Sequence, residues 1–348
     1  MVAIMEKMRA MVLSECAKIE TNPLKLTQID RHEIKRGNEI LLKIEACGVC
    51  HSQLHGIEGD WLDIGIPPAL PTVPGHEVVG KIIGIGKDVT KFKVGDRAGI
   101  TPLLEACQKC QYCLEGKEYL CESSIITGES FKGGYTEYIT VTENFATKVP
   151  ESMKAEYAAP LFCAGITAYK AVKAAEPKQD KKIGIFGIGG VGHMAVQFAK
   201  VENCDVIAFS RTQSHLDVAK RLGANDAMKF TENQDEFLST LKEKHGTLDA
   251  AIVFAPADIV TDTAIKSVKK GGLIVIATVG ENPAFSAFEE KTIRGTLIGS
   301  TKDMEQVIKI CDEKNIEVIT QTFPLENANE VLKKLKDSEI EARGVLIP

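Results

Sequence analysis

Short apolar runs separated by turns dominate the first part of the chain. Between about residues 8 and 155, glycine and proline recur every few positions among β-branched runs such as Ile40–Ala46, Val78–Ile85 and Tyr135–Val141. This spacing is typical of the short strands of a barrel or sandwich. The proline-rich stretch 60–74 predicts a long loop instead. The pattern therefore predicts a β-rich domain in this part of the chain.

Between about residues 160 and 300, apolar runs alternate with segments of helical apolar spacing. The predicted strands are Lys182–Phe186, Asp205–Phe209, Leu248–Phe254, Leu273–Ala277 and Thr296–Ile298. The predicted helices are Val191–Val201, His215–Leu222 and one near Ile259–Lys269, followed by two near Met304–Glu313 and Leu325–Lys336. Strands that alternate with helices indicate a doubly wound parallel sheet, so the predicted fold class is α/β.

Length and charge limit the classes of function. At roughly 100–200 residues per domain, 348 residues favour two domains. The chain has 42 Lys and Arg against 48 Asp and Glu, a net charge of −6, and so lacks the basic field that binds nucleic acid. Glu6, Lys7 and Arg9 interrupt the apolar N-terminal segment, and no run of about 18 uncharged apolar residues occurs. We therefore expect a cytoplasmic protein with no membrane and no nucleic-acid partner.

A glycine-rich motif follows the first predicted strand of the α/β part. Gly187, Gly189 and Gly192 fit the G-x-G-x-x-G pattern, with Gly190 and Val191 inside it. The glycines permit a tight turn and close approach of a pyrophosphate, to which the next helix offers its N-terminal N–H groups. The motif, placed between a strand and a helix, predicts a dinucleotide site.

The end of the second predicted strand indicates which dinucleotide is bound. NAD sites usually have an Asp or Glu about 20 residues beyond the motif, whereas this chain has Ser210, Arg211 and Thr212 there. Because that carboxylate is missing, a 2′-phosphate is not repelled, and Arg211 and the two hydroxyls can bond it. The segment predicts NADP(H) over NAD(H).

Four cysteines lie close together in the sequence. Cys107, Cys110, Cys113 and Cys121 fall within fifteen positions. Four thiolates at short spacing suit tetrahedral zinc in a closed structural site. Disulfides are the alternative, and a reduced compartment disfavours them. The spacing therefore predicts a structural zinc lobe over about residues 105–122.

A second set of ligand-type residues is dispersed along the chain. It comprises Cys47, Cys50, His51, His55, His76, Glu77 and Cys163. A catalytic zinc takes three protein ligands and leaves one position open. Spacing alone does not select three ligands from this set, and a buried cysteine with surface histidines remains the alternative.

Together these motifs resemble the zinc-dependent medium-chain alcohol dehydrogenases. The resemblance covers nearly the whole chain and includes Cys-Gly-Val-Cys-His-Ser at 47–52, Pro-Gly-His-Glu at 74–77, Val-Gly-Asp-Arg at 94–97 and the terminal Ala-Arg-Gly-Val-Leu-Ile-Pro. The segment at 210–212 is most similar to the NADP(H)-dependent cinnamyl alcohol dehydrogenase branch. The resemblance implies a GroES-like catalytic domain over residues 1–160 and 299–348. It implies a Rossmann coenzyme domain over residues 161–298.

The resemblance also implies roles for individual residues. The catalytic zinc ligands are Cys50, His76 and Cys163, which with the lobe makes two zinc ions per subunit. The catalytic residues beside them are Ser52 and His55, as a proton relay, and Glu77. The cofactor residues outside the glycine motif and the 210–212 segment are His51, Thr167 and Arg343. Cys47 is a bystander, and Trp61 lies in a pocket wall.

Two positions depart from the family pattern. Gln53 stands where an Asp or Glu is usual beside the zinc histidine, so an amide oxygen is expected to bond His76. The lobe begins Cys-Gln where Cys-Gly is common, which is costly if Gln108 takes a left-handed conformation. The histidines in charged segments are expected to face solvent; they are His32, His215 and His245.

The implied activity is reversible hydride transfer between primary alcohols and NADP, in an NADP(H)-dependent zinc alcohol dehydrogenase or aldehyde reductase. Pro102, where some relatives have a bulky aromatic residue, predicts a pocket that admits aromatic substrates. The alternative is a polyol or sugar dehydrogenase of the same family that uses NAD(P), which the apolar Leu62, Ile64 and Ile66 disfavour. The expected partner is a small-molecule alcohol or aldehyde, and the expected assembly is a homodimer or homotetramer.

Overall fold

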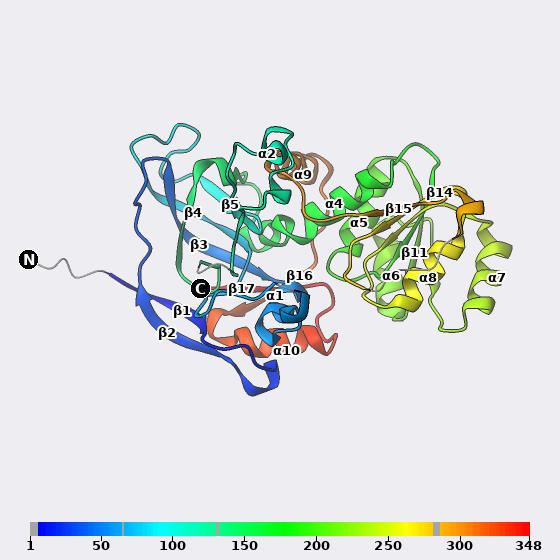
Figure 1. The fold of residues 1–348 in the computed structure, drawn as a ribbon, viewed down its shortest axis with the longest axis horizontal. Helices are drawn as coiled ribbons and strands as arrows, with labels where there is room; N and C mark the ends of the chain where they lie inside the picture. The colour runs from blue at the N-terminus through cyan, green and yellow to red at the C-terminus, as the bar shows by residue number, and fades with distance from the viewer. Residues whose placement is uncertain (1–5, 65, 130–131, 281–285) are drawn as a thin grey trace, which may run out of the picture. The chain divides into compact units, whose positions relative to one another are not determined.

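The chain divides into two compact units in a computed structural model that describes residues 6–64, 66–129, 132–280 and 286–348 (Figure 1). The first unit takes Met1–Cys163, Gly299–Asp312 and Val318–Pro348. The second takes Ala164–Ile298 and Glu313–Glu317. The first is rich in strands and the second alternates strands with helices, which confirms the mixed α/β class.

A seven-stranded sheet forms the centre of the first unit. Its strands run in the order β16-β17-β3-β4-β5-β9, with β8 also paired to β3. Their bounds are β3 Glu39–Val49, β4 Glu77–Ile85, β5 Arg97–Ile100, β8 Tyr138–Thr142, β9 Ala146–Lys148, β16 Thr320–Pro324 and β17 Arg343–Ile347. Two smaller antiparallel pairs accompany it, β1 (Lys7–Leu13) with β2 (Leu24–Asp30) and β6 (Leu103–Glu105) with β7 (Ile125–Ile126).

The helices of the first unit are mostly short. They are α1 His51–Glu58, α2 Gln111–Leu114, α3 Ala155–Ala158, α9 Thr301–Lys314 and α10 Ala328–Lys336. Helix α10 is amphipathic, because Ala328, Val331, Leu332 and Leu335 recur at helical spacing and are all buried. It packs against α1, in which Leu54 and Ile57 are buried (Figure 1).

The second unit is a doubly wound fold. Its six parallel strands have the order β12-β11-β10-β13-β14-β15. The strands are β10 Lys182–Phe186, β11 Asp205–Ser210, β12 Asp226–Lys229, β13 Leu248–Val253, β14 Val268–Ile276 and β15 Thr292–Gly295. The helices are α4 Ala164–Ala174, α5 Gly192–Val201, α6 Gln213–Arg221, α7 Gln234–His245 and α8 Asp258–Ser267. This is the strand order of dinucleotide-binding folds, with the switch point between β10 and β13.

The last predicted strand of this sheet was misplaced. The predicted strand is Thr296–Ile298, whereas β15 covers Thr292–Gly295. Gly295 pairs with Ile276, the last residue of β14, and the N–H of Thr296 donates to the carbonyl of Ile276, so the ladder between the two strands ends there. Leu297 is accordingly 55% exposed despite its apolar character.

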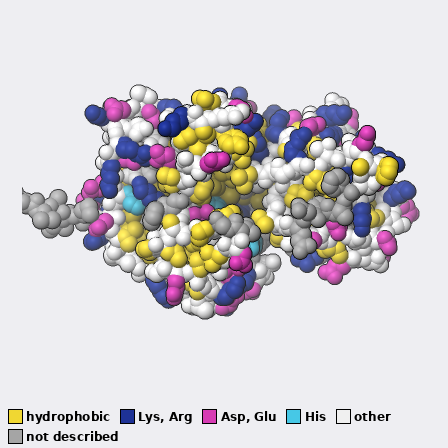
Figure 2. All heavy atoms as spheres, viewed as in Figure 1, with side chains coloured by type: hydrophobic (Ala, Val, Ile, Leu, Met, Phe, Trp, Pro, Cys, Tyr) yellow, Lys and Arg dark blue, Asp and Glu magenta, His cyan; other side chains and the backbone are white. Residues whose placement is uncertain are grey.

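The exposed surface of the described chain carries charges of both signs. Figure 2 shows acidic and basic side chains interspersed across the face in view. In the part of the chain that the structure describes, no helix combines the length and apolar character that a membrane crossing requires.

The expectation that His32 faces solvent is wrong, and the burial of this histidine affects the stability of the protein in acid. His32 is half-buried, and burial, with Lys132 and Lys35 nearby, lowers its pKa to about 4. Below pH about 6.5 the unfolded chain therefore binds a proton that the folded chain excludes, so stability falls as the pH drops toward 4. Between pH 7 and pH 5, we expect the natural chain to lose at most about 2 kcal/mol more unfolding free energy than His32→Gln. Urea unfolding at the two pH values measures this difference, and equal losses in both proteins would contradict it.

Candidate functional site

Strand register brings together the first two residues of the dispersed ligand set. Strand β3 pairs antiparallel with β4, and Gly48 lies opposite Glu77. Cys50 follows the end of β3 as the N-cap of α1, while His76 immediately precedes β4. Because the two strands run in opposite directions, the residues that follow Gly48 and the residues that precede Glu77 lie toward the same end of the sheet. Cys50 and His76 therefore emerge close to each other.

Cys163 completes this cluster from a different part of the chain. It ends the short helix Ala159–Phe162, and its Sγ lies 3.9 Å from the Sγ of Cys50. The ligand atoms of Cys50, His76, Glu77 and Cys163 all lie within 4.8 Å of one another. Cys163, His76 and Glu77 are buried, and Cys50 is half-buried. The structure thus brings together the three residues that the resemblance implied as zinc ligands.

The donor set and its spacing fit a zinc ion. Two thiolates, each about 2.3 Å from a zinc at the tetrahedral angle, lie about 3.8 Å apart, close to the distance between Cys50 and Cys163. A disulfide would need about 2.05 Å. The hydrogen bond with Cys163 lowers the pKa of the Cys50 thiol well below its ordinary value and raises that of Cys163. The two sulfurs therefore share one proton, and a metal ion bound there would displace it and leave both sulfurs as thiolates.

Cys47, the other cysteine of this segment, has a different environment. It is fully buried in β3, and its Sγ is directed to the carbonyl of Gly48. Burial raises the pKa of its thiol. Ser52, by contrast, faces the cluster, since its Oγ donates to the Sγ of Cys50 at 3.1 Å and lies 3.4 Å from Nε2 of His76.

A buried ion pair joins Glu77, a member of this cluster, to Arg343. Arg343, the first residue of β17, donates from Nη2 to Oε1 of Glu77, and both side chains are almost completely buried. Burial raises the pKa of the Glu77 carboxyl, while the guanidinium opposes that rise. The carboxylate that the resemblance put near the metal is therefore held by the arginine that it put at the cofactor.

Gln53 does not bond the ring of His76, contrary to the expectation. Its Oε1 accepts a hydrogen bond from the backbone N–H of Gly75 instead, and Nδ1 of His76 is buried with no hydrogen-bond partner among the described residues. The side chain of Gln53 therefore bonds the main chain and not the imidazole. It supports the turn before His76, where Gly75 has a φ of 101°.

The two histidines of α1 have different environments. His51, at the first position of the helix, is exposed. His55 Nδ1 lies 2.9 Å from Oδ2 of Asp60, a carboxylate that sequence analysis did not single out. Nothing in the sequence around Asp60 marks it as a partner of His55, because only the chain reversal at Gly59 brings the two residues together.

The four-cysteine lobe has the geometry of a second metal site. The sulfurs of Cys107, Cys110, Cys113 and Cys121 lie within 4.8 Å of one another, with 3.9 Å between Cys107 and Cys113. Backbone N–H groups of Lys109 and Cys110 lower the pKa of the Cys107 thiol to about 6. Gln108 has a φ of 58°, so the Cys-Gln departure does place a non-glycine residue in the left-handed region.

The glycine motif has the expected turn in the second unit. Gly187 has a φ of 101°, and a Cβ on Gly192 would lie 2.0 Å from the carbonyl oxygen of Gly187. A Cβ on Gly189 would meet no described atom within 4 Å, so the loop leaves open space beside that residue. Gly190 and Val191 lead from this loop into α5. An open glycine turn at a helix N-terminus fits a pyrophosphate.

The tip of β11 lies next to this turn, because Gly187 N–H donates to the carbonyl of Phe209. Ser210 is buried there, and Arg211 and Thr212 are exposed.

His215 is half-buried with its Nδ1 3.4 Å from Oγ of Ser210, so the expectation that it faces solvent is wrong. The same expectation is wrong for His245, which is half-buried and bonded to Asp226 at 2.9 Å. Thr167 lies on α4 in the same unit, half-buried.

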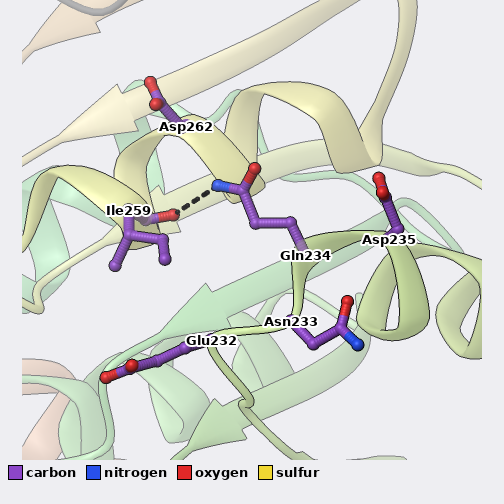
Figure 3. A pocket seen from close by; sticks show the side chains of 6 residues that line it. All are labelled: Glu232, Asn233, Gln234, Asp235, Ile259 and Asp262. Atoms are coloured by element: carbon purple, nitrogen blue, oxygen red, sulfur yellow. Dashed lines mark hydrogen bonds between the residues drawn. The ribbon is translucent and has the colours of Figure 1, made fainter.

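A depression at the starts of α7 and α8 does not suit the dinucleotide. It is lined by Glu232, Asn233, Gln234, Asp235, Ile259 and Asp262, and Gln234 bonds the carbonyl of Ile259 across it (Figure 3). Three carboxylates would repel a pyrophosphate, and the lining includes no thiol or imidazole. The candidate sites therefore remain two, the sulfur cluster of the first unit and the glycine turn of the second.

Comparison with known proteins assigns both units. Residues 36–151 match the alcohol dehydrogenase GroES-like domain, and residues 190–313 match the zinc-binding dehydrogenase family. An alcohol dehydrogenase of Geobacillus stearothermophilus is 38% identical over 97% of this chain and 99% of its own length.

Two solved structures illustrate the range of relatives. A cinnamyl alcohol dehydrogenase from Sorghum bicolor is 27% identical and has a TM-score of 0.86, with 98% of each chain covered. An acetophenone reductase from Geotrichum candidum in complex with NAD is 28% identical and has a TM-score of 0.87, with 99% of this chain and 98% of that chain covered.

Fold, site and comparisons together define a zinc-binding dehydrogenase with a GroES-like part and a Rossmann part, as predicted. The chain belongs to the zinc-dependent medium-chain alcohol dehydrogenase family, which includes the cinnamyl alcohol dehydrogenases among its solved members.

Proposed function

We propose that this protein is an NADP(H)-dependent zinc alcohol dehydrogenase or aldehyde reductase that interconverts primary alcohols and aldehydes. The observation that carries the proposal is the convergence of Cys50, His76 and Cys163, at a sulfur spacing that suits one zinc. Bound there, zinc would supply the Lewis acidity that polarises the substrate oxygen, and NADP(H) would supply or accept the hydride.

The chain's own residues hold and move the proton in this proposal. Ser52, whose Oγ touches the cluster, takes the proton of the alcohol and passes it toward His55, which exchanges it with solvent. Imidazole suits this last step because one of its ring nitrogens can accept a proton while the other donates a hydrogen bond. Glu77 and Arg343 form a buried ion pair at the ligand cluster, which fixes the Glu77 carboxylate beside the ligands. Thr167, His51 and Arg343 are assigned to the cofactor on the family resemblance.

The proposed preference for NADP(H) is supported by the residues at the tip of β11. Arg211 is exposed beside the buried Ser210, and no carboxylate occurs at residues 210–212. A planar guanidinium there can pair with a 2′-phosphate, whereas NAD has no such group. A relative of this fold was solved with NAD, so these local residues, not the fold, carry the preference.

Replacing Arg211 with alanine tests that preference. We expect the KM for NADPH to rise about tenfold or more, because a charge-assisted pair contributes about 1.5–3 kcal/mol, while the KM for NADH changes less than about twofold. Lys220→Ala is the matched control, since Lys220 lies on α6, the helix that follows Arg211, but pairs with Asp226. Equal effects of Arg211→Ala on both cofactors would refute the assignment.

The substrate proposal favours apolar alcohols, including aromatic ones, over polyols. Leu62 and Ile66, on the loop after Trp61, are 50% and 47% exposed and offer no hydrogen bonds to several hydroxyls. A panel of benzyl, cinnamyl and aliphatic alcohols and aldehydes, with sorbitol as the polyol arm, tests this with each cofactor. Activity confined to sorbitol would favour the polyol alternative.

Three further parts of the proposal need other measurements. About two zinc ions per chain in a metal assay would support both sites, and about one would support the lobe alone. A homodimer or homotetramer is expected from light scattering. We assign substrate chemistry to residues 1–160 and 299–348 of a cytoplasmic enzyme, and coenzyme binding to residues 161–298.

A further inference from the structure

The chain reverses direction immediately after α1 and returns to the proposed relay histidine. Gly59 ends the helix in the left-handed conformation, with a φ of 77°, and the N–H of Asp60 donates to the carbonyl of His55 at 3.0 Å. This turn places Oδ2 of Asp60 2.9 Å from Nδ1 of His55. The ring of the next residue, Trp61, lies 5.3 Å from the imidazole at an angle of 30°. Two consecutive residues therefore fix one imidazole by its nitrogen and by its face.

The carboxylate of Asp60 is itself anchored. Its Oδ1 accepts a hydrogen bond from Nζ of Lys18 at 3.2 Å, and Lys18 also donates to Glu58. Glu58 accepts in addition from the backbone N–H of Ile19 and from Lys336. The bonds from His55 and Lys18 lower the pKa of Asp60, so it is ionised at neutral pH.

An ionised carboxylate can only accept hydrogen bonds, so the proton of neutral His55 must lie on Nδ1. The lone pair is then on Nε2, which becomes the nitrogen that can receive a proton. When it does, the imidazolium remains next to a negative charge.

We propose that Asp60 is a positioning residue for the relay: it fixes His55 in the Nδ1–H tautomer and presents Nε2 as the proton acceptor. This inference rests on the proposed alcohol dehydrogenase function. Trp61 limits rotation of the same ring, so the tautomer and the orientation are set together.

The test replaces Asp60 with asparagine, which keeps the shape but can donate as well as accept. We expect kcat for alcohol oxidation near pH 7 to fall about tenfold or more, with KM changed less than about twofold, because the proton step alone is impaired. The solvent deuterium isotope effect on kcat should increase, and added imidazole buffer should restore part of the rate. Glu58→Gln is the matched control, since it disrupts the same Lys18 network one step away.

A spectroscopic measurement tests the tautomer without turnover. With ¹⁵N-labelled histidine, and His55→Gln to assign the signal, we expect the natural chain to show the Nδ1–H pattern and Asp60→Asn to show mixed tautomers. Unchanged kcat, isotope effect and ¹⁵N signals in Asp60→Asn would overturn the role of Asp60. A natural chain that is inactive on every alcohol, yet shows the Nδ1–H pattern, would instead overturn the proposed function and leave the His55–Asp60 contact established.

Discussion

Replacing Cys50 with serine is expected to lower kcat/KM for alcohol oxidation by about a thousandfold or more and to remove about one of two zinc ions per chain. The Cys50 sulfur is one of only two in the cluster, and a serine hydroxyl stays protonated at neutral pH where a thiolate binds metal. Lewis-acid polarisation contributes several kcal/mol to such a step, and each 1.36 kcal/mol is tenfold in rate. Zinc content and kcat/KM measured on the same preparation report both losses.

Cys47→Ser is the matched control for this substitution. The two cysteines lie three residues apart, but Cys47 is buried in β3 and its sulfur is directed to the carbonyl of Gly48. We expect this variant to keep both zinc ions and near-natural turnover, apart from some loss of stability. Substituting cobalt should give thiolate charge-transfer bands that weaken in Cys50→Ser and persist in Cys47→Ser. Full zinc content and activity in Cys50→Ser would show that the cluster is not the catalytic metal site.

This contrast illustrates what spacing could and could not decide. Residue types alone left Cys47, Cys50 and the histidines equivalent, and the resemblance selected among them. The physical reason for the selection is register: Gly48 pairs with Glu77, so the residue two positions further on emerges beside His76. Register depends on the partner strand, which no local pattern around Cys47 or Cys50 encodes.

The fold was predictable where periodicity was strong. Strand β10, which is buried in the middle of its sheet, was placed at its observed bounds, and the glycine turn after it has the predicted form. The last strand was misplaced because its end is set by where β14 stops, not by its own β-branched residues. Edge strands depend on such long-range limits more than central strands do.

The contacts that surround the site were the least predictable. Glu77 with Arg343, Gln53 with Gly75, and His55 with Asp60 each join side chains to partners that composition does not distinguish from many others. Gln53 shows why: its amide oxygen could accept from the His76 ring or from the backbone N–H of Gly75, and only the folded loop decides between them. His32 shows the converse, since its charged neighbours in sequence suggested exposure whereas packing half-buries it.

Replacing Cys113 with serine should destabilise the protein strongly while leaving its chemistry almost intact. The lobe offers few other restraints: Leu114 is 75% exposed, and the four sulfurs are its shared centre. Loss of a structural metal is among the changes that cost more than about 4 kcal/mol, which for a unit of this size lowers Tm by about 10 °C. Calorimetry and a zinc assay should show this fall together with the loss of about one zinc ion per chain.

The lobe also stabilises a helix elsewhere in the first unit, which makes the effect larger than a local one. Glu118, within the lobe, accepts hydrogen bonds from both the N–H and the hydroxyl of Thr301 at the start of α9. If the lobe loses its metal and Glu118 moves away, the N–H of Thr301, which has no partner within the helix, loses its hydrogen-bond acceptor. Cys16→Ser, at a cysteine outside both clusters, should leave Tm within about 2 °C. A Cys113→Ser variant that keeps its Tm but loses kcat would reverse the roles that we assign to the two metal sites.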